Sequence, residues 1–503
     1  MKRRLPPIFY NATTLFGMTF ATVMFVLAVI LIIFDIFGGF SNSYSGLVTY
    51  IALPGLMFFG LFVAAIGLMR ARKREKRGEL PADLPIIDLN QPRQRFLATS
   101  FALGGLILTA LSGFGSYKGY EYTESVQFCG TTCHNVMEPE YTAYQGSPHA
   151  RVTCAGCHIG AGVDWYVKSK LSGSYQVYST IFNKYERPIK TPIANLRPAK
   201  ETCEQCHWPK HFFTQKVRTH DYFLSDEENT EHTTSMLVKI GGGEGAQAQG
   251  IHAHMYLDST VSYYASDRER QVIPYVEMKD KNGKVTVFRD STAKVNEADL
   301  EKENMRVVDC IDCHNRPTHI FRSAAQAVDT ALSAGTIDKT VPEIKSKAVE
   351  VLDAKYATRP EALKKISDDL HAYYKETYAS FMATGAAKLD SAIAAIQAIY
   401  KQNYFPEMRT DWRSHNDNLD HMRFNGCFRC HNDKLKSDTG KVISKDCRTC
   451  HTFVSQGKKG EVKTDFGGMD FQHPVDIGEE WKTTPCKDCH GEQKEEPAEE
   501  PKK

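Results

Sequence analysis

Cysteine and histidine recur along this 503-residue chain in one fixed order, two cysteines followed directly by a histidine. In C-x-x-C-H the two thiols can add covalently to the vinyl groups of a porphyrin, while the adjacent imidazole reaches the iron. One copy would be weak evidence, but the chain has six, together with one C-x-x-x-C-H variant, and these seven motifs use all 14 cysteines. We therefore predict seven covalently attached haems of the c type. The motifs are Cys129/Cys133/His134, Cys154/Cys157/His158, Cys203/Cys206/His207, Cys310/Cys313/His314, Cys427/Cys430/His431, Cys447/Cys450/His451 and Cys486/Cys489/His490.

Two other uses of cysteine pairs fit this pattern less well. Zinc ribbons also contain C-x-x-C, but they need two pairs for each metal ion and do not require a histidine after every pair. A disulfide framework suits small exported domains, whereas this chain is long, and cysteines three residues apart are poorly spaced for long-range bridges.

Each motif histidine supplies one axial ligand, so the second must come from elsewhere in the chain. Seven of the 18 histidines belong to the motifs and eleven do not. Histidines that lie near a motif, or beside a proline that stiffens the backbone, are favoured. We expect one of His252 and His254 to bind iron and favour His220 over His211, whereas His232, His371 and His415 are expected at the surface. The predicted distal ligands are His149, His220, His252, His319, His421 and His473.

The first motif differs from the other six. Three residues separate Cys129 from Cys133, which shifts His134 relative to the ring, and Met137 follows three residues later. A thioether ligand raises the potential of a haem above that of a bis-histidine haem. Met137 is therefore a candidate ligand of the first haem, and an apolar contact is the alternative.

Three apolar runs near the N-terminus, at about 15–37, 47–69 and 96–114, are each long enough to cross a bilayer at about 20 residues per span. The third contains several small and hydroxyl residues, and a buried helix is its alternative. Basic residues precede the first run and fill the connection between the second and third. By the positive-inside bias both segments are cytoplasmic, which places the chain after residue 114 in the periplasm of a bacterial cell. Haem of the c type is attached in that compartment, so the two signals agree.

Charge also limits the partners. Residues 1–114 carry 11 of the 62 basic and 5 of the 60 acidic side chains, which leaves 51 basic and 55 acidic for the rest. A slightly acidic exported part argues against nucleic acid as a partner.

The exported part divides into segments with different signals. We expect a four-haem domain at 115–322 with a haem-free insertion at 208–309, where Asn282-Gly283 between β-branched runs predicts a hairpin. Residues 323–405 have helical spacing and no cysteine, which predicts two or three helices, either a spacer or docking arm or a plain structural bundle. A three-haem domain at 406–490 and a disordered tail at 491–503 follow. The expected fold class is a mainly α, haem-dominated multihaem cytochrome c with three N-terminal transmembrane helices, residues 1–114, and a small β-hairpin insertion.

The region from about residue 96 to residue 207 resembles the NapC/NirT family of membrane-anchored quinol dehydrogenases. The motifs that carry the resemblance are CGTTCHNVMEP, SPHARVTCAGCHIG, KSKLSG and ETCEQCHWP. The longer arrangement, with three spans and seven haems, resembles the seven-haem inner-membrane cytochromes of this kind. The resemblance implies a first haem at the membrane surface beside a quinol pocket, with the family's methionine and lysine at Met137 and Lys170. Gln176 and Val177 stand where the family has an acidic residue after the lysine, and a headgroup contact is the other interpretation of Lys170.

These features predict a quinol dehydrogenase of the cytoplasmic membrane. It would pass electrons from the quinol pool, with menaquinol as donor, through seven haems c to periplasmic c-type cytochromes, in anaerobic or extracellular respiration. One alternative is a membrane-tethered electron carrier that does not oxidise quinol. Another is a terminal reductase of a small oxyanion, which would need an exchangeable ligand position that a lost motif histidine usually marks, and all seven motifs keep theirs.

Overall fold

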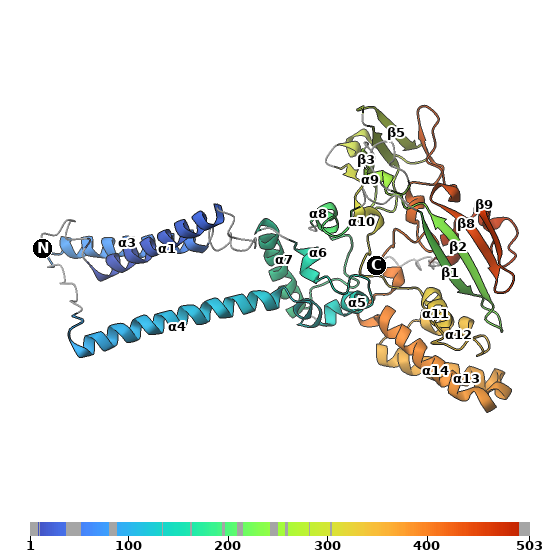
Figure 1. Cartoon of the computed structure of the whole chain (residues 1–503), viewed down its shortest axis with the longest axis horizontal. Coiled ribbons are helices and arrows are strands. Elements are labelled where there is room, and N and C mark those ends of the chain that lie inside the picture. Colours follow the sequence, from blue (N-terminus) through green and yellow to red (C-terminus); the bar gives the residue numbers. More distant parts are fainter. Residues whose placement is uncertain are drawn as a thin grey trace, which may run out of the picture. The chain divides into compact units, whose positions relative to one another are not determined.

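The structure is a computed structural model, and about half of the described chain is helical. It forms two compact units, one built from residues 1–128 and 154–177 and the other from residues 129–153 and 178–503. Figure 1 labels their elements. The described residues are 9, 11–36, 52–79, 88–132, 134–160, 163–193, 197–208, 215–241, 250–256, 260–280, 282–301 and 304–491.

The first unit contains two apolar helices, α1 (Ala12–Ile36) and α3 (Leu53–Lys76), that pack along each other. Small residues make the contact, because a Cβ atom added to Gly17 would lie only 2.4 Å from the backbone nitrogen of Ala64. Such residues let helix backbones approach closely, as in helix pairs within bilayers. By length and composition both helices could cross a membrane. They correspond to the first two predicted spans, although residues 37 and 47–51 lie outside the described residues.

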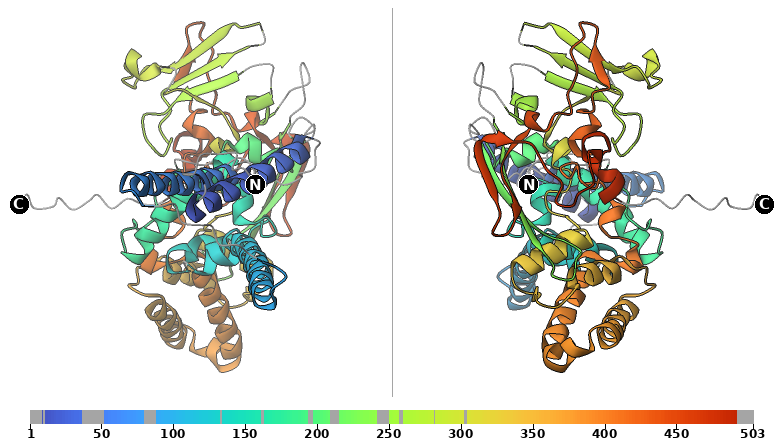
Figure 2. Two further views of the ribbon diagram at one scale, coloured as in Figure 1. Left: turned by 90° about the vertical axis from the view of Figure 1, so that its left-hand side faces the viewer. Right: turned by 90° about the vertical axis from the view of Figure 1, so that its right-hand side faces the viewer.

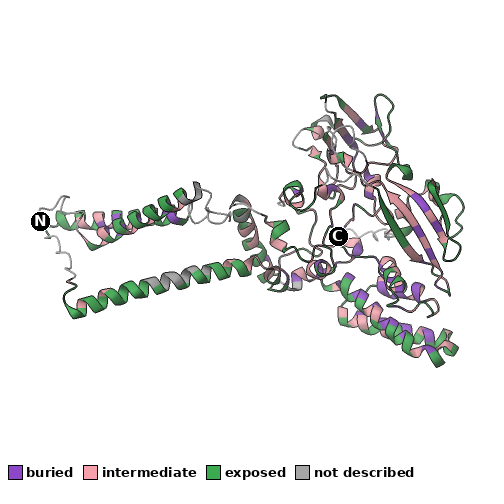
Figure 3. Ribbon diagram, viewed as in Figure 1, coloured by how far each residue is buried: buried purple, intermediate pink, exposed green. Residues whose placement is uncertain are grey.

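The third apolar run lies within one continuous helix, α4 (Pro92–Thr123), of 32 residues. At 1.5 Å per residue the helix is about 48 Å long, more than the apolar thickness of a bilayer, about 30 Å. Large apolar side chains along it are exposed, including Phe96, Phe101 and Phe114 at 70%, 85% and 63%. Figure 3 colours most of the described part of this helix as exposed. Among the described residues, α1 and α3 are the two helices that are long and apolar enough to cross a membrane by length and composition. A membrane crossing by α4 therefore stays a prediction.

The second unit contains two antiparallel sheets, which Figures 1 and 2 show from three sides. The first has the order β1-β2-β8-β9 and the second the order β6-β3-β4-β5-β7. The strands of the first are β1 (Lys216–Phe223), β2 (Glu231–Val238), β8 (His451–Lys458) and β9 (Lys463–Met469). Those of the second are β3 (Thr260–Tyr264), β4 (Tyr275–Lys279), β5 (Val285–Asp290), β6 (Arg306–Val307) and β7 (Leu435–Ser437).

The predicted hairpin is confirmed, but the small insertion is wrong in extent. Strands β4 and β5 pair on either side of Asn282-Gly283, with Gly283 at φ 81°, a left-handed conformation that favours glycine. Each sheet also takes strands from the last hundred residues, because β2 pairs with β8 and β5 with β7. Such pairings join segments far apart in the sequence, which local turn and alternation signals do not reveal.

The cysteine-free segment forms four helices rather than two or three. They are α11 (Ala324–Ser333), α12 (Ile344–Asp353), α13 (Arg359–Thr377) and α14 (Ala379–Asn403). The side chain of Ser323 caps α11 by accepting a hydrogen bond from the backbone of Gln326, and Pro360 lies in the first turn of α13. Their apolar faces meet in a core whose fully buried members include Val328, Ile344, Leu352, Ile366, Leu389 and Ile396. The domain boundaries predicted inside this unit stay predictions.

The same core contains a buried ion pair between two of its helices. Lys345 of α12 is bonded to the carboxylate of Asp329 in α11, and their side chains are 5% and 13% exposed. Lys345 also donates to the carbonyl oxygen of Ala325 at 2.8 Å, and Asp329 accepts from the backbone nitrogen of Phe223 at 3.1 Å. Burial lowers the pKa of Lys345 and raises that of Asp329, so burial disfavours both charges and each depends on the other.

Candidate haem sites

Six of the seven motifs contain or end a short helical turn. In such a turn residues three apart lie on the same side, so the two thiols of a C-x-x-C pair face one way. None of the described cysteines forms a disulfide. The turns are α6 (Cys154–His158), α8 (Ala199–Cys203), α10 (Cys310–Cys313), η9 (Gly426–Arg429), η10 (Cys447–Thr449) and α16 (Cys486–His490).

The predicted attachment cysteines are not equally buried. In the second, third and seventh motifs the first cysteine is half-buried and the second is exposed. The exposed residues of these motifs are Cys157, Cys206 and Cys489 and the adjacent His158, His207 and His490. Attachment of haem at Cys157, Cys206 and Cys489 stays a prediction that rests on motif spacing.

The first motif has a different backbone. Its first cysteine lies in a π-helical turn, η3 (Phe128–Thr132), which accommodates more residues per turn than an α-helix and so matches the extra residue of C-x-x-x-C-H. A Cβ atom on Gly130 would lie 2.2 Å from a ring carbon of Tyr141 in α5 (His134–Gln145), so this position requires glycine. Cys133 and the side chain of His134 lie outside the described residues.

Each of the last five motif histidines has a second imidazole opposite it at nearly the same distance. Two metal–nitrogen bonds of about 2.0–2.1 Å, extended by about 1 Å to each ring centre, separate two imidazoles on opposite sides of one metal ion by about 6 Å. The observed pairs therefore have the spacing that a shared iron requires. The ring centres are 6.1 Å apart for His207 and His149, 6.3 Å for His314 and His252, 5.9 Å for His431 and His254, 6.1 Å for His451 and His421, and 6.0 Å for His490 and His473.

Backbone carbonyls orient several of these rings. A histidine that binds a metal through one ring nitrogen usually donates the N–H of the other to such a group, which fixes the tautomer and the direction of the ring. The other ring nitrogen, Nε2, is then the one that would bind the metal. The Nδ1 atom lies 3.2 Å from the oxygen of Pro317 in His149, 3.1 Å from Ile240 in His252, 2.6 Å from Ile251 in His254, 2.9 Å from Ser444 in His431 and 2.8 Å from Val475 in His473.

Three of the predicted distal ligands each face one motif histidine. His149 faces His207, His421 faces His451, and His473 faces His490. The prediction that one of His252 and His254 binds iron differs from the structure, in which both face motif histidines. A spacing of two residues allows two imidazoles to reach different partners, and sequence reasoning did not consider that possibility.

The other two predicted ligands have different surroundings. His220 is exposed on β1 and its ring stacks on Tyr222 at 6.0 Å, so within the described residues no ring contact pairs it with a motif histidine. His319 directs Nδ1 to the backbone oxygen of Glu140, 3.0 Å away in α5, as the paired histidines direct theirs to other carbonyls. Burial lowers the pKa of His319.

Two histidines expected at the surface are buried, so that prediction is wrong for them. His232 is 9% exposed and His415 is 7% exposed. His232 lies in a strand that has neighbours on both sides, and the ring of His415 packs on Phe321 at 6.3 Å. Burial, with a contribution from Arg316, lowers the pKa of His415 to about 3. His371 is the partly exposed member of the group, and His211 lies outside the described residues.

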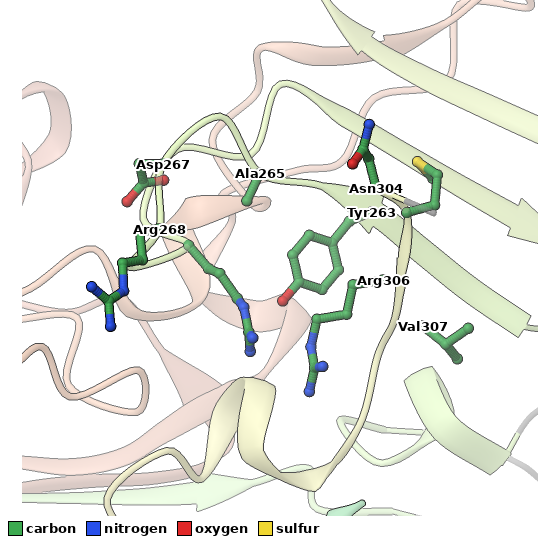
Figure 4. A pocket seen from close by; sticks show the side chains of 9 residues that line it. Tyr263, Ala265, Asp267, Arg268, Asn304, Arg306 and Val307 are labelled. Carbon is green, nitrogen blue, oxygen red and sulfur yellow. The ribbon is translucent and has the colours of Figure 1, made fainter. Parts of the chain in front are cut away.

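A buried carboxylate fixes the fourth motif to the second sheet. Asp312, between the two cysteines of this motif, is 4% exposed. It accepts hydrogen bonds from the hydroxyl of Tyr263 and from Nε of Arg306, both at 2.7 Å, and from Arg270 at 3.4 Å. Tyr263, Arg270 and Arg306 also line a cavity of about 480 Å³ together with Arg268 (Figure 4). These hydrogen bonds tie the residue between the two cysteines of the motif to the second sheet and to Arg270.

An ion pair in the first unit contains the lysine that the resemblance assigns to a quinol pocket. Lys170 of α7 (Val163–Ile181) is bonded to the carboxylate of Glu124, the residue that follows α4, and lies 3.5 Å from the hydroxyl of Thr123. The side chain of Glu124 is 12% exposed, whereas Leu171 and Tyr175 on the same helix as Lys170 are 70% and 67% exposed. The sequence analysis considered an acidic residue only after Lys170 and did not identify Glu124, which precedes the lysine by 46 residues. The available signal was an acidic residue immediately after an apolar helix.

Among known proteins, one relative matches nearly the whole chain, and other matches cover a quarter of it or less. The model of the NapC/NirT cytochrome c family, N-terminal region, matches residues 91–200. The cytochrome c-type protein ImcH of Geobacter sulfurreducens is 41% identical over 493 residues, which cover 97% of this chain and 96% of that protein. The cytochrome c-type proteins TorC and NapC of Escherichia coli K12 are 26% and 27% identical over 24% and 21% of this chain, and the matches cover 35% and 64% of their lengths. No solved structure matches.

The family match covers α4 and the first two motifs, and the near-complete alignment to ImcH extends over the remaining haem motifs. The chain therefore belongs to the NapC/NirT family of membrane-anchored c-type cytochromes that transfer electrons, in the group that Geobacter ImcH represents.

Proposed function

We propose that this protein is a quinol dehydrogenase of the cytoplasmic membrane that passes electrons from menaquinol through seven haems c to periplasmic c-type cytochromes. The observation that carries this proposal is the ion pair between Lys170 and Glu124. It joins a proton acceptor and a hydrogen-bond donor at the end of a long apolar helix, five residues before Cys129. A lipid-soluble donor that must give up protons as well as electrons needs both groups near the membrane surface.

Different residues have different roles at the proposed quinol site. Oxidation of a quinol to a quinone releases two electrons and two protons. The ammonium group of Lys170 is positioned to hydrogen-bond a quinol oxygen and to favour its anionic form, and the carboxylate of Glu124 is positioned to accept a proton from a quinol hydroxyl. The exposed apolar side chains of Leu171 and Tyr175 offer contact to a lipid-soluble ring. Met137, one helical turn after His134 on α5, is the candidate ligand of the first haem.

Bound haem c supplies reversible one-electron chemistry, and the protein holds and orients it. The seven motifs attach the haems, and the motif histidines are the proximal ligands. His149, His421 and His473 are distal ligands of the third, sixth and seventh haems, which their 6.0–6.1 Å spacing from the motif histidines supports. His319 remains a candidate distal ligand because its Nδ1 is held by a carbonyl. The structure offers His220 no such support.

The membrane topology has three crossings, with α4 as the third. Basic residues in the last turn of α3, such as Arg74 and Lys76, mark the cytoplasmic side. The haem-bearing segments after α4 are then periplasmic. The exposed apolar side chains along α4 support this arrangement, because water would not favour them.

A reduction experiment in a bilayer tests the proposed function. Purified holoprotein in liposomes should be reduced by a menaquinol analogue dissolved in the lipid, as followed by the haem absorbance, and an added periplasmic c-type cytochrome should be reduced in turn. Dithionite provides the measure of complete reduction. Protein that dithionite reduces but quinol does not would be a membrane-tethered electron carrier, and the dehydrogenase proposal would be wrong.

The number of haems gives a second prediction. Because every cysteine belongs to a motif, the mature protein should exceed the 56.6 kDa of the bare chain by the mass of seven haems, and denatured protein should contain no titratable thiol. Intact-mass spectrometry and a thiol reagent measure the two quantities. A mass for six or fewer haems in fully matured protein would contradict the prediction, and the first motif would be the place to look.

Distal ligands give a third prediction. Replacing His149, His421 or His473 by alanine should convert one low-spin haem to high spin and leave the other haems unchanged, because one iron loses one imidazole. Electron paramagnetic resonance counts the spin states, and added imidazole should restore the low-spin form. His371→Ala is the matched control, because this side chain is partly exposed and bonded to Asp390 at 2.9 Å. An unchanged spectrum in all three variants would show that these histidines are not ligands.

A further inference from the structure

We propose that the single turn around α9 (Ala253–Tyr256) supplies distal ligands to two different irons, His252 to the fourth haem site and His254 to the fifth. The turn would thereby hold the fourth haem site, the last of the NapC/NirT-like part, beside the fifth, the first of the C-terminal group. This inference rests on the proposed function, since it takes the paired histidines as iron ligands.

The two imidazoles face different motif histidines. His252 lies 6.3 Å from His314 with the rings nearly parallel, at 6°, and His254 lies 5.9 Å from His431 with the rings at 74°. Rotation about a metal–nitrogen bond leaves the distance unchanged, so both geometries fit one iron between the rings. Two residues along a chain span at most about 7 Å, so both ligands come from the same short segment of backbone.

The backbone holds both rings in place. His252 Nδ1 lies 3.1 Å from the oxygen of Ile240, and the backbone nitrogen of His252 also donates to that oxygen at 3.1 Å. Ile251 donates to the oxygen of Lys239 at 2.9 Å, and Lys239 donates to the oxygen of Cys450 in the sixth motif at 2.8 Å. The turn is thus tied to the end of β2, and its ligands cannot move independently of the sheet.

The attachment motifs of the two sites meet independently of these histidines. Arg429, between the two cysteines of the fifth motif, is 8% exposed and donates at 2.5 Å to the backbone oxygen of Asp312, between the two cysteines of the fourth. The same guanidinium donates to the oxygen of Arg270 at 3.1 Å, and Arg270 in turn contacts the carboxylate of Asp312. Asn418 donates to the oxygen of Asp312 at 3.0 Å. Proximal and distal sides therefore both place the fourth and fifth sites next to each other.

Spin-state counting tests the assignment on the full-length holoprotein in detergent. His252→Ala and His254→Ala should each convert one haem to high spin, and the double variant should convert two. His252→Met and His254→Met keep a ligand, so each should instead shift the reduction potential of one haem upward, which a spectroelectrochemical titration reads in variants that mature normally. His371→Ala is the control and should change neither measurement, because this side chain is partly exposed and bonded to Asp390.

The outcomes separate this inference from the proposed function. A double variant with only one high-spin haem, or a His254 variant identical to the parent in spin state and potential, would overturn the shared turn while leaving a seven-haem quinol dehydrogenase intact. A parent protein that lacks low-spin haem altogether would overturn both. Magnetic broadening of the high-spin signal in either single variant would further support adjacent sites, because the neighbouring iron is then within coupling distance.

Discussion

Lys170→Met should slow reduction of the haems by a menaquinol analogue at least tenfold, which corresponds to about 1.4 kcal/mol of activation free energy. The substitution removes the ammonium group that would stabilise the developing quinol anion and leaves the length of the side chain almost unchanged. Glu124→Gln should give a decrease of similar size, because the amide cannot accept the quinol proton. Stopped-flow absorbance of protein in liposomes measures the rate.

Lys168→Met is the matched control for this prediction. Lys168 lies two residues away on the same helix, and its ammonium group sits over the ring of Trp165 at 4.6 Å rather than against a carboxylate. It should reduce at close to the parental rate, and all variants should be reduced by dithionite as fast as the parent. If Lys170→Met and Glu124→Gln both accept electrons from quinol at the parental rate, the quinol site lies elsewhere.

Lys345→Met should lower the free energy of unfolding by about 3–5 kcal/mol, which is the usual cost of removing one partner of a buried ion pair. The loss arises because Asp329 would keep its carboxylate in the helical core with no cation beside it. Replacing both residues with apolar ones of similar size should recover most of the stability, since the desolvation of the two charges disappears with them. Urea unfolding followed by far-ultraviolet circular dichroism measures the change.

Lys364→Met serves as the control for this experiment. Lys364 also pairs with an aspartate, Asp368, but its side chain is 77% exposed, and such pairs contribute little to stability because water screens them. Its unfolding midpoint should therefore lie close to that of the parent. A Lys345→Met protein that unfolds at the parental urea concentration would show that the buried pair does not stabilise this core.

The sequence by itself determined the features that depend on a few neighbouring residues. The order Cys-x-x-Cys-His predicts six of the seven attachment sites, and its longer variant the first, because both thiols and the imidazole come from one short segment. Asn282-Gly283 located the β4–β5 hairpin because glycine allows the left-handed backbone that the turn needs. Apolar spacing located the helices of 323–405, although it undercounted them, because α13 and α14 are separated at Tyr378 without a proline or glycine.

The tertiary structure decided which distant residues meet. His254 faces His431 although 177 positions separate them, and Glu124 reaches Lys170 across 46. Eleven histidines outside the motifs are candidates for the distal positions, and the residues next to each one in the sequence do not show which of them bind iron. The choice depends on long-range strand pairing such as that of β2 with β8, which brings the His252–His254 turn against the later motifs. Local sequence signals carry no information about such pairings, because their stability comes from contacts that exist only after the chain has folded back on itself.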